Sequence, residues 1–156
     1  MSSALPFDDS YIGQYTNARP KMDQYGYAGT LFPITEIIGA TDWMTLDQMK
    51  KPYFNQGWEV GAHATTAATH SQSMNGMTSA ERQAELRALK GWQVANGFQS
   101  DSFAWPNGTF DAVSVADVQQ VYALGRIGGC RPPSNRSPHC RTASSPGALP
   151  SRHWTK

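Results

Sequence analysis

The sequence predicts an α/β fold built on a parallel sheet, and two observations support this prediction. Between residues 5 and 125, four short apolar segments alternate with four segments of helical character. Strands and helices that alternate in this way form parallel sheets with right-handed crossovers. In addition, distinctive polar residues follow three of the apolar segments, and parallel sheets carry their chemistry past the carboxyl ends of their strands.

The first half of this pattern contains two strands and one helix. A strand is expected at Leu5-Pro6-Phe7, where Pro6 favours an edge position because proline cannot donate a hydrogen bond to a neighbouring strand. Residues 15–25 have helical character, with Pro20 near the middle and a glycine stop at residue 26. The apolar segment 29–34 is expected to form the second strand.

The second half continues the alternation with clearer end signals. Thr45 is a helix N-cap, and Gly57 closes that helix. Thr78-Ser79-Ala80-Glu81 is a capping box, which predicts a helix to about residue 96. The remaining elements are expected as strands at 58–63 and 102–105 and as a helix at 111–124, where Val115, Val118 and Tyr122 have helical spacing.

The charge distribution predicts one folded domain followed by a tail. The 156 residues are enough for one hydrophobic core. Up to residue 125 the chain has 7 basic and 12 acidic residues, a net charge of −5, whereas residues 126–156 have 6 basic and no acidic ones. This second segment also holds 5 of the 10 prolines. We therefore expect one folded domain over 1–125 and a basic Pro/Ser/Arg-rich tail over 126–156 that is disordered or is not native sequence.

Several partners and locations are not favoured by composition. The net charge of +1 gives no reason to expect nucleic acid, although the basic tail leaves open a tether to nucleic acid or another acidic polymer. The tail residues Cys130, His139, Cys140 and His153 could form a zinc site or a disulfide, but their spacing fits no standard zinc pattern. No apolar stretch is long enough to span a membrane, and the first four residues do not resemble a secretory signal, so the compartment stays open.

The residues at the predicted strand ends could form a metal site. Asp8 and Asp9 follow the first strand, and His63 ends the third, with His70 seven positions later. A carboxylate and two imidazoles suit Zn²⁺ or a similar divalent ion. Such a cation would lower the cost of keeping two adjacent acids ionised, and the second acid would be free to act as a general base on metal-bound water.

Each of these signals also has a simpler explanation. An Asp pair after a strand often provides a helix N-cap and a turn. His63 could be a satisfied histidine at a strand end, and His70 could be an ordinary loop residue. Trp105-Pro106-Asn107-Gly108, after the fourth strand, has the composition of a simple turn. Only their joint placement at successive strand ends favours a functional site.

The chain resembles the polysaccharide deacetylase family, with its NodB-homology fold of carbohydrate esterase family 4. Residues 6–10, Pro-Phe-Asp-Asp-Ser, are similar to the family's Thr-Phe-Asp-Asp-Gly motif. The segment from His63 to His70 is a loose match to His-Ser/Thr-x-x-His, and residues 103–108 are similar to the third motif. The resemblance implies a (β/α) barrel of the NodB type, here partial or distorted and truncated at its C-terminus, so that residues 1–125 would be an incomplete catalytic domain.

The resemblance also implies roles for individual residues. Asp8 would be the catalytic base, and the metal ligands would be Asp9, His63 and His70. The backbone N–H of Asn107 would stabilise the oxyanion, and the substrate would lie against Trp105, Pro106 and Gly108. The expected reaction is hydrolysis of acetyl groups on a polysaccharide, such as N-acetyl groups of chitin or peptidoglycan or O-acetyl groups of xylan. The expected cofactor is a divalent metal ion, Zn²⁺.

Three departures from the family pattern bear on activity. Ser10 replaces a glycine that would tolerate a positive φ. The second histidine comes seven positions after the first where the family has four, which a helical loop could accommodate because residues i and i+7 share a face. The family's later acid and general-acid histidine have no counterpart beyond residue 125. The alternative is therefore a truncated, weak or inactive relative that binds carbohydrate or metal without turnover.

Overall fold

Two short parallel sheets form the centre of the protein. The computed structural model describes residues 5–127, so the predictions made for residues 128–156 lie outside the described part. In the first sheet, the strand order is β1 (Leu5–Asp8), β2 (Gly29–Phe32) and β3 (Glu59–Val60). The second sheet pairs β4 (Ser102–Ala104) with β5 (Leu124–Arg126). Pro6 lies on the edge strand β1, where it costs no hydrogen bond.

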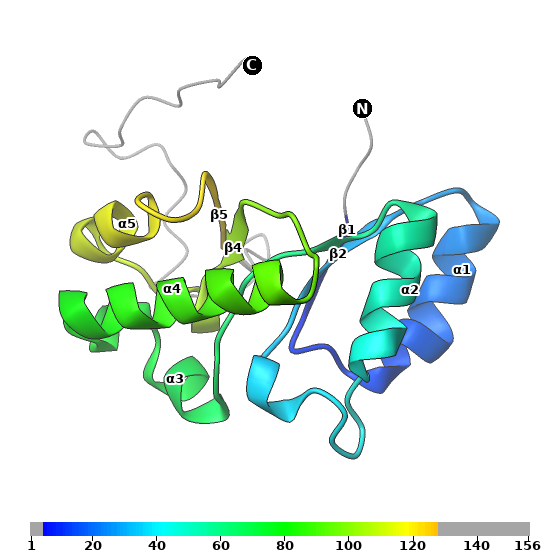
Figure 1. Ribbon diagram of the computed structural model, residues 1–156, viewed down its shortest axis with the longest axis horizontal. Helices are drawn as coiled ribbons and strands as arrows, with labels where there is room; N and C mark the ends of the chain where they lie inside the picture. Colours follow the sequence, from blue (N-terminus) through cyan, green and yellow to red (C-terminus); the bar gives the residue numbers. More distant parts are fainter. Residues whose placement is uncertain (1–4, 128–156) are drawn as a thin grey trace, which may run out of the picture.

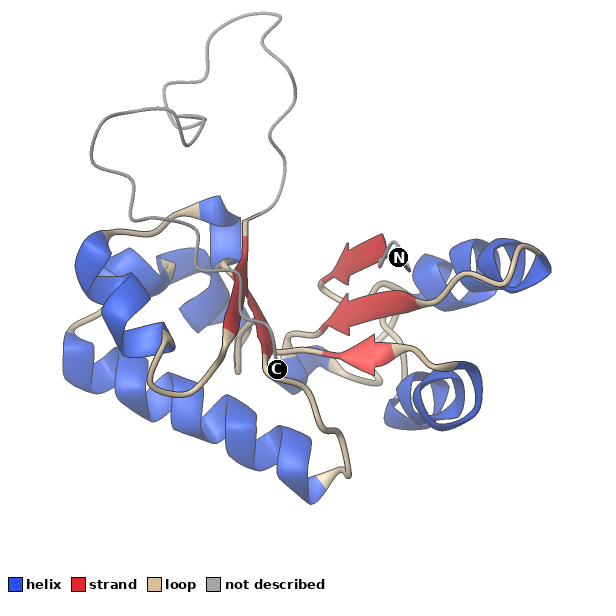
Figure 2. Cartoon of the chain, turned by 90° about the horizontal axis from the view of Figure 1, so that it is seen from above, coloured by secondary structure: helices blue, strands red, loops and turns tan. Residues whose placement is uncertain are grey.

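Residue Ala62 joins the two sheets. It forms a parallel bridge with Phe103, in which the Ala62 N–H donates to the Ser102 carbonyl at 2.9 Å and the Ala104 N–H donates to the Ala62 carbonyl at 2.8 Å. The strands therefore follow one another in sequence order from β1 to β5, flanked by helices (Figure 2). This arrangement confirms the predicted partial (β/α) barrel.

The helices divide into two groups. In Figure 1, α1 (Arg19–Gln24) and α2 (Leu46–Gln56) lie at one end of the molecule, and α4 (Ser79–Ala95) and α5 (Ala112–Val118) lie at the other. Each group covers its own hydrophobic core. One core contains Leu31, Met49, Trp58 and Val60, and the other contains Leu86, Leu89, Phe103 and Tyr122. Within residues 5–127, no helix combines the length and apolar character needed to cross a bilayer.

The capping signals located two helices correctly. The side chain of Thr45 accepts a hydrogen bond from Gln48 N–H, and that of Thr78 accepts one from Glu81 N–H, so both are capping boxes. Gly57 ends α2 with a φ of 70°, a conformation that glycine adopts without the steric cost of a side chain.

Two helix predictions were wrong in extent. The helix expected over 15–25 begins as a π-helical segment, Gln14–Ala18, and becomes α-helical only at Arg19. Pro20 explains the change because its ring disturbs a regular α-helix on the preceding turn. The helix expected over 111–124 ends at Val118, and residues 124–126 form β5 instead. β5 thus extends one residue beyond the predicted domain boundary.

Three strands are shorter than expected. β2 ends at Phe32 because Pro33 follows, and Ile34 forms only an isolated bridge with Ala64. The strand expected over 58–63 is regular only at Glu59–Val60, and β4 ends one residue before Trp105. The remaining short elements are η2 (Thr35–Ile37), α3 (Ala67–Gln72), η3 (Met74–Gly76) and η4 (Pro106–Gly108).

Candidate active site

The acid pair lies where β1 turns away from the sheet. Asp8 is the last residue of β1, and Asp9 and Ser10 both adopt positive φ values, 63° and 59°. The turn is held by the Asp9 N–H, which donates to the Phe32 carbonyl at 3.0 Å, and by the Ser10 N–H, which donates to the Asp8 carbonyl at 2.8 Å. The backbone conformation that the family's glycine would favour is therefore present, but a serine adopts it.

His63 is held rigidly between the two sheets. It is 2 % exposed and lies between two bridged residues, Ala62 and Ala64. Its Nδ1 is 2.8 Å from the Ala104 carbonyl oxygen. Because a carbonyl can only accept, Nδ1 carries the proton in this contact, and Nε2 is the ring nitrogen that faces Asp9. This is the usual second contact of a metal-binding histidine.

His70 reaches the same point from α3. A continuous helical loop, which could have accommodated the spacing, is not what forms, because residues 62–64 are extended and α3 starts only at Ala67. The seven-residue spacing is therefore not two turns of one helix. It is an extended segment followed by one helical turn, and it still brings the two imidazole rings to a centroid separation of 4.8 Å.

Asp9, His63 and His70 form one cluster. The Oδ1 atom of Asp9 lies 3.5 Å from His63 Nε2 and 3.5 Å from His70 Nε2. One ligand atom from each residue lies within 4.8 Å of the others. Asp9 Oδ1 is also buried and has no hydrogen-bond partner among the described residues. A shared cation would stabilise a buried carboxylate oxygen that faces two imidazole nitrogens, so these three residues could hold a divalent metal ion.

The pKa values of two members favour metal ligation. The contact with His63 is the largest cause that holds the pKa of Asp9 below its ordinary value, against the effect of burial; at 3.5 Å this contact is more electrostatic than a true hydrogen bond. Burial, followed by the neighbouring His63, lowers the pKa of His70. At neutral pH Asp9 is thus an anion and His70 a neutral imidazole, the forms that bind divalent metals.

The turn after β4 closes the other side of the site. Asn107 has a positive φ of 57°, and its Nδ2 donates to the His70 carbonyl at 2.9 Å and to Ser73 Oγ at 2.8 Å. Its backbone N–H donates to no other described residue. An open pocket of about 340 Å³ is lined by Asp8, Asp9, His63, His70, Trp105, Asn107 and Gly108. Of the residues predicted for the site, only Pro106 is not part of the lining.

Sequence reasoning missed Arg126. Its Nη2 donates to Asp8 Oδ1, and its guanidinium lies 5.0 Å from the centre of the Phe32 ring. Asp8 and Arg126 are 118 positions apart, and Arg126 was assigned to the basic tail. No local pattern identifies this pair, because it forms only when β5 pairs with β4.

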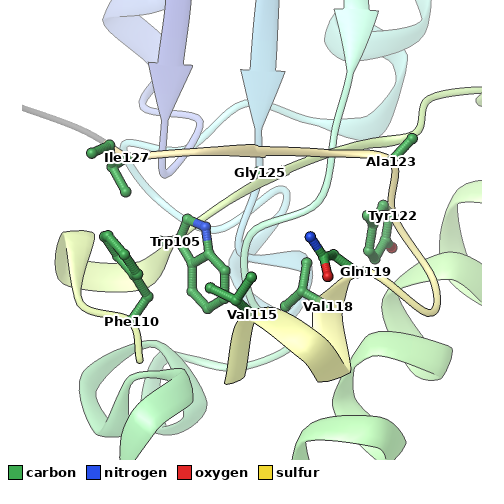
Figure 3. A pocket seen from close by; sticks show the side chains of 9 residues that line it. All are labelled: Trp105, Phe110, Val115, Val118, Gln119, Tyr122, Ala123, Gly125 and Ile127. Atoms are coloured by element: carbon green, nitrogen blue, oxygen red, sulfur yellow. The ribbon is translucent and has the colours of Figure 1, made fainter. Parts of the chain in front are cut away.

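A second pocket differs from the first in the kind of side chains that line it. It has a volume of about 290 Å³ and lies between α5 and β5, with Trp105 in its lining (Figure 3). Its lining is mainly apolar and includes Phe110, Val115 and Val118. It contains no acid, histidine or basic side chain. The functional groups are therefore concentrated in the pocket around Asp9.

The protein is thus a partial (β/α) barrel, and the Asp9–His63–His70 cluster lies at the carboxyl ends of its strands. The model of the polysaccharide deacetylase family matches residues 2–123. The chain belongs to this family, which confirms the resemblance drawn from the three motifs.

Individual relatives agree with this assignment. YxkH of Bacillus subtilis (strain 168), named as a polysaccharide deacetylase, is 31% identical over 89 residues, which cover 55% of this chain and 29% of YxkH. The Streptococcus pyogenes deacetylase PplD, solved in complex with acetate, has a TM-score of 0.73 at 23% identity, covering 80% of this chain and 55% of PplD. The polysaccharide deacetylase BC0361 from Bacillus cereus has a TM-score of 0.69 at 18% identity, covering 80% of this chain and 39% of BC0361. This chain thus spans between about a third and about half of these relatives.

Proposed function

We propose that this chain is a metal-dependent deacetylase that hydrolyses acetyl groups on a polysaccharide. The observation that carries the proposal is the position of Asp8 beside the Asp9–His63–His70 cluster in one polar pocket. Membership of the polysaccharide deacetylase family supports it. The acetate bound to PplD, the product expected of such a reaction, supports the same chemistry. Chitin, peptidoglycan and acetylated xylan are the candidate polymers.

The proposed ligands are Asp9, His63 and His70, and the mixed nitrogen and oxygen donors suit Zn²⁺. When bound, the ion would supply Lewis-acid chemistry to the acetyl carbonyl and to water. The protein's own part is to hold these donors in place before the ion binds. His63 does so through Ala104, and His70 does so through α3.

Asp8 is the proposed base. Arg126 donates to its Oδ1, and no described residue donates to its Oδ2, which is left to accept a proton from water. The water oxygen bonds to the acetyl carbon, and the bond to the sugar nitrogen or oxygen breaks. Asp8 can then return the same proton to the leaving group. The free Asn107 N–H is the proposed donor to the oxyanion, and Trp105, Pro106 and Gly108 are the proposed substrate-binding turn.

The test separates the base from the ligands. Zn²⁺-loaded protein is incubated with acetylated chitooligosaccharides, and the acetate released is measured. Asp8→Asn is expected to lower kcat by about 10²- to 10⁴-fold with Zn²⁺ affinity unchanged, whereas His63→Ala is expected to lose the metal. Asp47→Asn, at an exposed position of α2, is the matched control and should behave as wild type. Activity that persists in Asp8→Asn would exclude Asp8 as the base.

One observation favours the alternative of binding without turnover. His63 and His70 are the only histidines within residues 5–127, so no third imidazole in that part of the chain is available as a general acid. If this alternative holds, the wild-type protein binds Zn²⁺ and the oligosaccharide but releases no acetate. The assay above distinguishes the two outcomes.

A further inference from the structure

Glu85, a buried acid on α4, contacts the segment that separates the two histidines. It is 7 % exposed. Its Oε1 accepts from the Thr65 N–H at 2.6 Å and from the Thr69 hydroxyl at 2.9 Å, and its Oε2 accepts from the Thr65 hydroxyl at 2.5 Å. Among residues 5–127 no basic side chain forms an ion pair with Glu85. The two threonines are therefore its principal partners.

The two threonines lie between the two histidines of the Asp9–His63–His70 cluster in the sequence, so Glu85 contacts the segment that joins these candidate ligands. Thr65 follows His63 by two residues, and Thr69 directly precedes His70. A contact that holds both threonines on one carboxylate fixes the path of the chain between the two imidazoles. This matters because the spacing of the histidines is not set by one continuous helix.

The helix that carries His70 has no hydrophobic anchor. α3 is six residues long and contains no buried residue, so apolar packing does not determine where it lies. Polar contacts hold it instead. Glu85 contacts its N-terminal side through Thr65 and Thr69, and the Asn107 side chain holds its C-terminal side through His70 and Ser73.

We propose that Glu85 is a positioning residue for the candidate metal centre, which aligns His70 with Asp9 and His63 by fixing α3. The proposal rests on the proposed function in assuming that these three residues bind a divalent ion. Glu85 itself touches neither the ion nor the substrate. It acts on the geometry of the ligands by satisfying the Thr65 N–H and both hydroxyls.

The experiment measures Co²⁺ binding to the full chain through the visible absorption of the ion. Glu85→Leu removes both acceptor oxygens, and we expect the affinity for Co²⁺ to fall by about 10- to 100-fold, as for other residues that orient metal ligands. Glu85→Gln keeps one acceptor for the Thr65 N–H and can donate to its hydroxyl, so it should restore affinity to within about threefold. Thr65→Val keeps the backbone N–H that donates to Glu85 but removes the hydroxyl that does so, and it should therefore also lower the affinity for Co²⁺.

A structural control and a second readout complete the test. Leu89→Val lies on the same helix and perturbs the core, so it should lower stability without changing Co²⁺ affinity. Amide hydrogen exchange in α3, including the His70 N–H that donates to the Thr66 carbonyl at 3.0 Å, should be faster in Glu85→Leu than in Leu89→Val.

The possible results separate this proposal from the proposed function. Wild-type Co²⁺ affinity in both Glu85→Leu and Thr65→Val would overturn the role of Glu85. Failure of the wild-type protein to bind Co²⁺ would instead refute the proposed metal centre. In that case hydrogen exchange alone tests whether Glu85 fixes α3, and unchanged exchange in Glu85→Leu would overturn that role as well.

Discussion

At the residue scale, Ser10 is strained, because a residue with a side chain adopts the left-handed backbone conformation of the turn beside Asp9. Its φ of 59° lies in the left-handed region, which L-residues adopt at a cost of about 1–2 kcal/mol. Its hydroxyl is buried and has no hydrogen-bond partner among the described residues. The same turn places Asp9 Oδ1 3.5 Å from Nε2 of both histidines, so the strained residue lies directly beside the candidate site.

Replacing Ser10 with glycine should therefore stabilise the protein. We expect Ser10→Gly to raise the free energy of unfolding by about 1 kcal/mol, since relief of strain exceeds the added flexibility of the unfolded chain. Urea denaturation measures this change. Ser10→Ala is the control, because it removes the hydroxyl but keeps the Cβ. If alanine stabilised the protein as much as glycine, backbone strain would not be the cause.

At the scale of elements, the approach of β3 to β4 depends on Gly61. A Cβ at this position would lie 2.4 Å from Phe32 Cε1 and 2.7 Å from Ser102 Oγ. Gly61→Ala should therefore lower the free energy of unfolding by about 2–3 kcal/mol through overpacking. Gly91→Ala is the control on α4, where a Cβ meets nothing within 4 Å, and it should raise stability by about 0.5–1 kcal/mol. Thermal unfolding compares them, and equal effects would contradict the packing argument.

The contact between α4 and α5 depends on a buried ion pair. Arg82 Nε donates to Asp117 Oδ2 at 2.8 Å, and Ser79 Oγ donates to Asp117 Oδ1 at 2.8 Å. The hydrogen bond from Arg82 is the largest cause that lowers the pKa of Asp117 from its ordinary value of 3.8. A carboxyl with a lowered pKa in the folded state stabilises the protein above its unfolded pKa. This stabilisation is lost as the pH falls through the folded value.

The protein should accordingly lose stability as the pH falls below about 4, and Asp117 should account for part of the loss. Asp117→Asn is expected to lower the free energy of unfolding by about 3 kcal/mol at pH 7 and to reduce its dependence on pH in the acid range. Urea denaturation at several pH values tests this, with Asp47→Asn as the exposed control. An unchanged pH profile in Asp117→Asn would show that this pair does not contribute.

At the scale of the whole molecule, Arg126 connects the last strand of the described fold to the first. Its backbone belongs to β5, and its guanidinium pairs with Asp8 at the end of β1. The five strands thus curve far enough for the two ends of the series to meet at the polar pocket. The candidate base is oriented from an element that lies 118 positions away.

Loss of this connection should impair turnover without loss of metal. We expect Arg126→Met, which keeps the apolar bulk over Phe32, to lower kcat by about 100-fold because Asp8 is no longer oriented. Zn²⁺ affinity should be unchanged, since Asp9, His63 and His70 are not altered. Arg87→Met, an exposed position on α4, is the control. A loss of metal affinity in Arg126→Met would show that Arg126 supports the whole site and not Asp8 alone.

Features that depend on neighbours in the chain could be predicted from the sequence. The alternation of strands and helices, the caps at Thr45 and Thr78 and the edge position of Pro6 follow from periodicity, hydrogen-bonding capacity and fixed dihedral angles, all of which are local. The convergence of Asp9, His63 and His70 followed from one general rule, that the carboxyl ends of parallel strands meet at one edge.

The remaining features depend on contacts between distant parts of the chain. β5 has no strand pattern of its own and exists because Leu124–Arg126 pairs with β4. α3 buries no side chain and lies where Glu85 and Asn107 hold it. No local sequence pattern around Asp8 or around Arg126 predicts that these two residues pair. Such contacts join residues far apart in the sequence, and their free energy arises from surroundings that form only when the chain has folded, so local patterns carry no record of them.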